Sequence, residues 1–285
     1  MDRSHIPEST VVSVEFDGHV ATVWLDRPEQ RNAFAPDFWR DFPRIMGALG
    51  EDDETRAVVI AARGLSFSAG IDLKAFGPSF LSGGADPSAD TPKGSDVARR
   101  KALYQSIKEL QAAFTSVADC PKPVIAAIHG HCIGAGVDLI TACDIRYAAQ
   151  ETIFSVRETK IAMVADVGTM QRLPNIINPG YLAEVVYTGK DFPSSEALEM
   201  GLVTRVARDA EAVVALAQST AQDIAGNSPL AVQGIKAVLA HGEDRSVDEA
   251  LDYVALWNAA FIQSNDFVEA ITAFTEKRSP DFTGE

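Results

Sequence analysis

Two short, uninterrupted apolar runs constrain the fold of this chain most strongly. Residues 57–62 read AVVIAA and residues 124–128 read VIAAI, and polar or turn-forming residues bound each run. Runs this short and this apolar are typical of strands covered on both faces, as in a parallel sheet packed between helices. The sequence therefore predicts a layered α/β core whose central strands include these two runs.

The segments around these runs supply the rest of the predicted core. Residues 12–17 alternate apolar and polar side chains, Asp17-Gly18 offers a tight turn, and residues 20–25 form a second extended run, which together indicate a hairpin. Apolar side chains at helical spacing over residues 35–49 indicate a helix before the first apolar run. The other predicted elements are a helix over 134–142 and strands over 145–148 and 153–156. The order strand, strand, helix thus recurs along the chain.

Two stretches stand apart from this core. Of the 20 residues over 77–96, 14 are Gly, Pro, Ser or Asp, so we predict a surface loop that is either a functional lid or disordered. From Asp209 onward strand signals disappear, and the apolar residues of 247–262 cover more than one helical face. We therefore predict an α/β core over residues 1–208 and a C-terminal helical region over 209–285 that packs on the core or on another copy of the chain.

Composition and charge restrict the partners and the cellular setting. The 40 acidic and 25 basic residues give a formal net charge of −15 at pH 7, so we expect neither a nucleic acid nor a membrane as partner. Cys120, Cys132 and Cys143 show no CxxC or zinc-type spacing, which predicts buried, reduced thiols, no disulfide framework and no metal site. The first residues form no apolar signal segment, and no apolar run has the length of a membrane helix, so we expect a cytoplasmic protein.

Two glycine-containing segments follow the apolar runs and are suited to present backbone N–H groups to a ligand. In residues 66–73 (SFSAGIDL), small side chains around Gly70 leave the backbone accessible. In residues 128–138 (IHGHCIGAGVD), Gly-Ala-Gly opens the predicted helix, whose first N–H groups lack intrahelical acceptors. An ordinary strand-to-helix turn explains the first segment taken alone. The second segment is not a GxGxxG fingerprint, which excludes a dinucleotide-binding site of the Rossmann type.

Three carboxylates fall within or after the second segment. Asp138 lies in the first turn of the predicted helix, Glu158 follows a predicted strand, and Asp166 comes eight residues later. Each has a structural alternative: Asp138 complements the helix dipole, Glu158 is a solvated loop charge, and Asp166 caps a helix through 170–173. Together with two N–H-presenting turns, however, they match enolate chemistry on a thioester, in which two donors hold the oxyanion while a carboxylate takes the α-proton. Neighbouring carboxylates in an apolar pocket raise one another's pKa, which suits a group that accepts and returns a proton.

The motifs FSAGIDL (67–73) and PKPVIAAIHGHCIGAGVDLITACDIRYA (121–148) resemble the crotonase, or enoyl-CoA hydratase/isomerase, superfamily. The resemblance runs from about residue 11 to residue 277. It implies a spiral of repeated ββα units with a C-terminal helical oligomerisation region that forms homotrimers, commonly paired as homohexamers. It also implies an acyl-CoA thioester as substrate and no separate cofactor, because coenzyme A is part of the substrate.

This resemblance also implies roles for individual residues. The two oxyanion-hole N–H groups belong to Ile71 and Ala135; the family commonly has glycine at the second position, but a helix N-terminus tolerates alanine and keeps its N–H free. The substrate, with its CoA moiety, lies in a cleft lined by the loop after the hairpin, over residues 27–33, and by the first glycine-containing segment, over residues 66–73. The residues implied to bind it are Arg31, Ala33, Ser68, Ala69, Gly70, Asp72, Leu73, Lys74 and Gly134. Surface solubility is the alternative explanation for Arg31 and Lys74.

Asp138, Glu158 and Asp166 resemble the carboxylates of one subgroup, the isomerases that convert 3,5-dienoyl-CoA to 2,4-dienoyl-CoA in fatty-acid β-oxidation. The resemblance implies that Glu158 removes the C2 proton, the oxyanion hole holds the dienolate, Asp166 protonates C6, and Asp138 tunes Glu158. Hydratases of the family use two glutamates at the first two positions and usually have a small or apolar residue at the third. The alternatives are therefore an enoyl-CoA hydratase that uses Asp138 and Glu158, and a non-catalytic acyl-CoA-binding protein that retains the fold.

Overall fold

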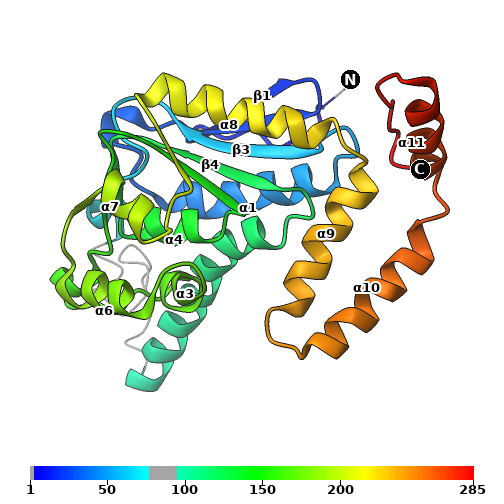
Figure 1. The fold of residues 1–285 in the computed structure, drawn as a ribbon. Coiled ribbons are helices and arrows are strands. Elements are labelled where there is room, and N and C mark those ends of the chain that lie inside the picture. The colour runs from blue at the N-terminus through cyan, green and yellow to red at the C-terminus, as the bar shows by residue number, and fades with distance from the viewer. Residues whose placement is uncertain (1–2, 77–94) are drawn as a thin grey trace.

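A computed structural model of the chain describes residues 3–76 and 95–285 (Figure 1). Its main feature is a six-stranded sheet with the strand order β1-β2-β3-β4-β6-β9. These strands are β1 (Val12–Asp17), β2 (Val20–Leu25), β3 (Ala57–Ala62), β4 (Val124–Ile128), β6 (Ile145–Ala149) and β9 (Arg205–Ala207). The first two form the predicted antiparallel hairpin, and every later neighbour in the sheet is parallel. The layered α/β prediction is confirmed.

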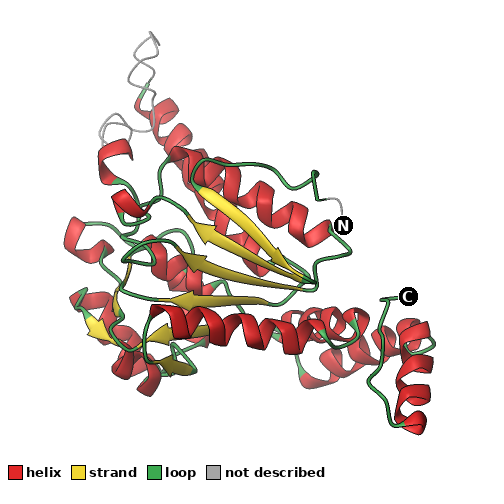
Figure 2. Ribbon diagram, turned by 90° about the horizontal axis from the view of Figure 1, so that it is seen from above, coloured by secondary structure: helices red, strands yellow, loops and turns green. Residues whose placement is uncertain are grey.

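Helices cover both faces of this sheet, which explains the continuous apolar runs of β3 and β4. On one face lie α1 (Pro36–Glu51), α3 (Asp96–Ala118) and α4 (Ala135–Thr141), and on the other lies α8 (Ala210–Ala225) (Figures 1 and 2). Val58 and Ile60 of β3 pack into the first core with Phe42 of α1. Val59 and its alternating neighbours instead pack against Ala217 in the second core. Both sets are buried because successive side chains of a strand point to opposite faces.

After β4 the chain passes into a small second sheet, which contains part of the second glycine-containing segment (residues 128–138). It contains β5 (His131–Ile133), β7 (Ile153–Ser155) and β8 (Phe192–Pro193), with β5 parallel and β8 antiparallel to β7. Gly130 makes the turn into β5 with φ +62°, and a Cβ there would lie 2.0 Å from the carbonyl oxygen of Leu65. The remaining elements of the core are η1 (Pro28–Gln30), η2 (Glu158–Ile161), α5 (Thr169–Arg172), η3 (Leu173–Asn175), α6 (Pro179–Thr188) and α7 (Ser194–Glu199).

The C-terminal helices follow α8 and project beside the core (Figure 1). They are α9 (Pro229–Gly242), α10 (Val247–Phe261) and α11 (Asn265–Glu276). No residue of α10 is buried in the chain, and Val247 and Leu251 are 74% and 58% exposed. The region over 209–285 therefore begins with a helix of the core layer, α8, and continues with helices that leave apolar surface open. The division at residue 208 stays a prediction.

Several further expectations concern single segments. The predicted loop over 77–96 lies outside the described residues, apart from Ser95 and Asp96, which begin α3. α3 itself is absent from the elements predicted above, although Leu110, Phe114 and Val117 have helical spacing and are buried. The three cysteines are buried and free, as predicted. Among the helices of residues 3–76 and 95–285, none combines the length and apolar composition needed to cross a membrane.

Candidate active site

The two glycine-containing segments meet edge to edge. Ser68 pairs with Cys132 in a parallel bridge. The N–H of Ser68 donates to the carbonyl of His131 at 2.9 Å, and the N–H of Ile133 donates to the carbonyl of Ser68 at 3.0 Å. The loop after β3 is thereby fixed beside β5, and the ends of these two segments face the same space.

The N–H groups of Ile71 and Ala135 are both free at this junction. The N–H of Phe34 donates to the carbonyl of Gly70, and the carbonyl of Phe34 accepts from the N–H of Asp72. The N–H of Ile71, between these two residues, therefore points away from Phe34. Ala135 is the first residue of α4, where an N–H has no intrahelical acceptor. Within the part of the chain that the structure describes, neither N–H has a hydrogen-bond acceptor. A Cβ on Gly70 would lie 3.5 Å from the Ala135 nitrogen, so the two donors lie close together.

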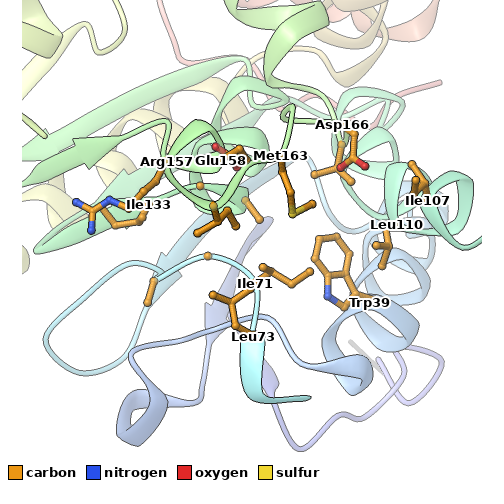
Figure 3. Close-up of a pocket in the computed structure, with 16 residues that line it drawn as sticks. Trp39, Ile71, Leu73, Ile107, Leu110, Ile133, Arg157, Glu158, Met163 and Asp166 are labelled. Carbon is orange, nitrogen blue, oxygen red and sulfur yellow. The ribbon is translucent and has the colours of Figure 1, made fainter. Parts of the chain in front are cut away.

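Both donors line a cavity with mainly apolar walls (Figure 3). Trp39 comes from α1, Ile107 and Leu110 come from α3, and Ile71 belongs to the first glycine segment. The other described lining residues are Ala69, Gly70, Leu73, Ile133, Gly134, Ala135, Arg157, Glu158, Ile161, Met163, Asp166 and Val167. Two carboxylates thus face an apolar cavity that also contains two free N–H donors.

Glu158 lies against the second glycine segment. It is the first residue of η2, directly after the turn from β7, and a Cβ on Gly134 would lie 3.2 Å from its Oε1 atom. Gly134 has φ +53°, so glycine serves both the backbone conformation and this close approach. Burial, followed by the nearby charge of Asp138, raises the pKa of Glu158 to about 7. The carboxyl group can therefore accept and release a proton near neutral pH.

Asp138 lies behind the cavity rather than on its wall. The side chain is fully buried on α4, and its Oδ1 accepts a hydrogen bond from the N–H of Thr169 at 2.5 Å. Asp138 lies in the first turn of α4, and this hydrogen bond links α4 to the first residue of α5. Burial raises the pKa of Asp138 to about 6. Its position next to Glu158 and behind the cavity suits a group that acts through its neighbour's pKa.

Asp166 lines the cavity at a distance from Glu158, with Met163 between them in the view of Figure 3. Burial raises the pKa of its half-buried carboxyl group. The N-cap of α5 is Gly168, so the structural alternative that Asp166 caps this helix is wrong. Instead, the backbone carbonyl of Asp166 accepts a hydrogen bond from Gln111 Nε2 at 2.7 Å. The side chain is left to face the cavity.

Four of the residues predicted to bind substrate, Ala69, Gly70, Leu73 and Gly134, line the cavity. Ser68 is fully buried, and its hydroxyl donates to the carbonyl of Asn32 and accepts from the N–H of Gly70. Asp72 forms an ion pair with Arg27 at 3.3 Å and accepts the N–H of Lys74. Neither residue is among those that line the cavity, and both side chains are bonded within the loop, so their assignment to substrate binding stays a prediction.

The remaining three predicted contacts lie near the cavity without lining it. Arg31 is exposed, and its carbonyl accepts the N–H of Ala69 at 2.9 Å. Ala33 is half-buried on the same loop, and Lys74 is exposed on the helical turn over 73–76. Their assignment to the CoA moiety stays a prediction.

The sequence reasoning missed most of the apolar wall. Trp39 lies on the predicted first helix, next to Phe38, and Arg157 directly precedes Glu158. Ile107 and Leu110 belong to α3, which was not predicted, yet their spacing with Phe114 was a readable helical signal. Ile161 is the last residue of the single turn η2 and Met163 lies in the irregular stretch after it, so neither gives a periodic signal.

Comparison with known proteins places this geometry among relatives. The family model described as enoyl-CoA hydratase/isomerase matches residues 15–285. The chain is 44% identical to the mitochondrial Delta(3,5)-Delta(2,4)-dienoyl-CoA isomerase of Rattus norvegicus, over 91% of this chain and 77% of that protein. It is 41% identical to the peroxisomal protein of the same name from Arabidopsis thaliana, over 95% of each. The crystal structure of an enoyl-CoA hydratase from Bacillus anthracis superposes with a TM-score of 0.85 at 30% identity, covering 97% of this chain and all of that chain.

Proposed function

The chain belongs to the enoyl-CoA hydratase/isomerase family, and we propose that it is a dienoyl-CoA isomerase of fatty-acid β-oxidation that converts 3,5-dienoyl-CoA to 2,4-dienoyl-CoA. One observation carries this proposal. Glu158 and Asp166 both line the cavity that contains the free N–H groups, whereas Asp138 lies behind it. Relatives named as dienoyl-CoA isomerases at 41–44% identity support the same reaction.

The arrangement accounts for each step of the reaction. The N–H groups of Ile71 and Ala135 hold the thioester oxygen as negative charge develops on it. Glu158 takes a proton from C2, and the electron pair of that C–H bond spreads over the conjugated dienolate. Asp166 then gives a proton to C6, which leaves double bonds at C2 and C4. One proton is lost and one gained, so the reaction needs no oxidant and no cofactor beyond the CoA of the substrate.

The hydratase alternative is less well supported by the same geometry. A hydratase holds a water molecule between two carboxylates, which must both reach the cavity. Asp138 has no exposed surface, and its Oδ1 is bound to Thr169. Only one member of the pair Asp138 and Glu158 is therefore in position to hold such a water.

Ultraviolet absorbance tests the proposed reaction directly. We expect the absorbance of a conjugated 2,4-dienoyl-CoA to grow when the protein is mixed with a 3,5-dienoyl-CoA. A parallel reaction with a 2-enoyl-CoA in water should show little loss of absorbance. Rapid hydration without formation of the conjugated product would make the chain a hydratase, and no change with either substrate would support a binding protein.

The pH dependence follows from the protonation states of Glu158 and Asp166, because the reactive form carries one proton on the pair. Glu158 must be ionised to accept the proton from C2, and Asp166 must be protonated to donate a proton to C6. As the pH falls, both groups become protonated and the base is lost. As the pH rises through about 7, the pKa of Glu158, the one proton that remained on the pair of carboxyl groups dissociates. Asp166 then has no proton to donate. We expect a bell-shaped profile of kcat/KM with its alkaline limb near pH 7; a rate that keeps rising above about pH 8 would contradict this assignment.

We also propose assembly into a homotrimer or homohexamer through the C-terminal helices. A groove between α9, α10 and α11 is lined by apolar side chains, among them Leu230, Leu239 and Trp257. Helix α10 has no buried residue in the single chain, which favours burial against another copy. The molar mass in solution, measured by light scattering, tests this assembly. A cytoplasmic location stays a prediction; the two relatives above are named as mitochondrial and peroxisomal.

A further inference from the structure

One row of polar side chains on α3 holds the segment that carries Asp166. Gln111 Nε2 donates to the carbonyl of Asp166 at 2.7 Å. Four residues further along the same helix, Thr115 Oγ1 accepts from Arg172 Nη2 at 3.1 Å. Residues four apart lie on one face of a helix, so this row contacts both ends of the segment over 166–172.

The helix that carries this row is itself firmly packed. Leu110, Ala113, Phe114 and Val117 of α3 are buried in the core of the protein. The ring of Phe114 lies 5.0 Å from that of Trp39, centroid to centroid, and Trp39 also lines the cavity. The side chain of Gln111 therefore starts from a rigid element next to the active site.

The segment around Asp166 makes few hydrogen bonds, although the neighbouring side chains of Ala165 and Val167 are buried. Residues 163–168 belong to no helix or strand. Among the described residues, Gln111 is the one partner outside this stretch that hydrogen bonds the main chain between residues 164 and 167. The next anchor is the bond between Thr169 and Asp138, at the start of α5. Packing of the two flanking side chains places this stretch, and the hydrogen bond from Gln111 fixes the direction of the Asp166 carbonyl.

The amide of Gln111 is oriented for this role. Its Oε1 accepts a hydrogen bond from Lys108 Nζ at 2.8 Å, which leaves the NH2 group to face Asp166. An amide supplies both the acceptor and the donor that these two neighbours require. Neither an ionised carboxylate nor an apolar side chain at position 111 would serve both.

We propose that Gln111 is a positioning residue that aims the carboxyl group of Asp166 at C6 of the dienolate. This inference rests on the proposed function. A misplacement of about 1 Å in a reacting group can reduce a rate by about 10²-fold. Glu158 is held separately, in η2 and against Gly134, so its removal of the C2 proton does not depend on Gln111. Loss of Gln111 should therefore slow the second proton transfer and leave the first.

The substitution Gln111→Leu tests this separation of the two proton transfers. We expect kcat for isomerisation to fall by about 10- to 100-fold, with KM within about twofold of the wild-type value. In D2O, the dienolate should still form and return to C2. Mass spectrometry of the recovered 3,5-dienoyl-CoA should therefore show that the ratio of C2 deuterium exchange to isomerisation rises as kcat falls, after subtraction of exchange without enzyme.

Two further variants complete the test. Gln111→Glu keeps the length of the side chain but replaces the donor by a carboxylate, and we expect the same rise in the ratio. Gln105→Leu is the same substitution at an exposed position of α3. It should change neither the rate of isomerisation nor the rate of C2 deuterium exchange. The inference is overturned if kcat of Gln111→Leu is unchanged, or if exchange and isomerisation fall together, with or without a lower Tm. Failure of the proposed function is distinct, because the wild-type protein would then form no conjugated product.

Discussion

Replacing Glu158 by Gln is expected to reduce kcat for isomerisation by about 10³-fold. The amide keeps the size of the side chain and its place beside Gly134, but it cannot accept the C2 proton. Deuterium exchange at C2 should fall by the same factor, since both processes begin with this proton transfer. Absorbance of the conjugated product and mass spectrometry of the recovered substrate measure the two rates.

The stability and binding of this variant should be retained. Burial raises the pKa of Glu158, so its ionised form is disfavoured in the folded protein, and stability decreases as the pH rises through about 7. A neutral amide avoids this effect, and the free energy of unfolding above pH 7 should be equal or higher. Glu151→Gln, at an exposed position, is the matched control and should leave kcat unchanged. A Glu158→Gln enzyme with near-normal C2 exchange would exclude Glu158 as the base.

Replacing Asp166 by Asn is expected to lower isomerisation by about 10³-fold while leaving C2 exchange and acyl-CoA binding near normal. The amide has no acidic proton to give to C6, but the oxyanion-hole donors and Glu158 are untouched. The dienolate should therefore form and return to C2. This pattern differs from that of Glu158→Gln, in which both rates fall, and the same two measurements distinguish them.

The matched control is Asp53→Asn, on the exposed surface between α1 and β3, which should change neither rate. An unchanged rate of isomerisation in Asp166→Asn would remove Asp166 from the mechanism. Parallel loss of C2 exchange at an unchanged Tm would instead place Asp166 in the first proton transfer. Either result would require another donor for C6.

Much of the fold was readable from local sequence patterns. β3 and β4 were predictable because a strand buried on both faces needs an uninterrupted apolar run. The hairpin was predictable because Asp17-Gly18 favours a tight turn between extended runs. α3 was missed even though its apolar spacing was present, and with it two residues of the cavity wall.

The sequence also supplied the candidate chemistry, through two glycine-containing segments and three carboxylates. It could not determine which carboxylates face the substrate, because that depends on contacts between residues far apart in the chain. Asp138 lies behind the cavity because Thr169, 31 residues later, binds its Oδ1. Asp166 faces the cavity, with its backbone held by Gln111, 55 residues earlier. Local patterns fix strands and helices through period and turn chemistry, whereas the tertiary packing of α3, α4 and the segment over 166–172 alone decides where each carboxyl group points.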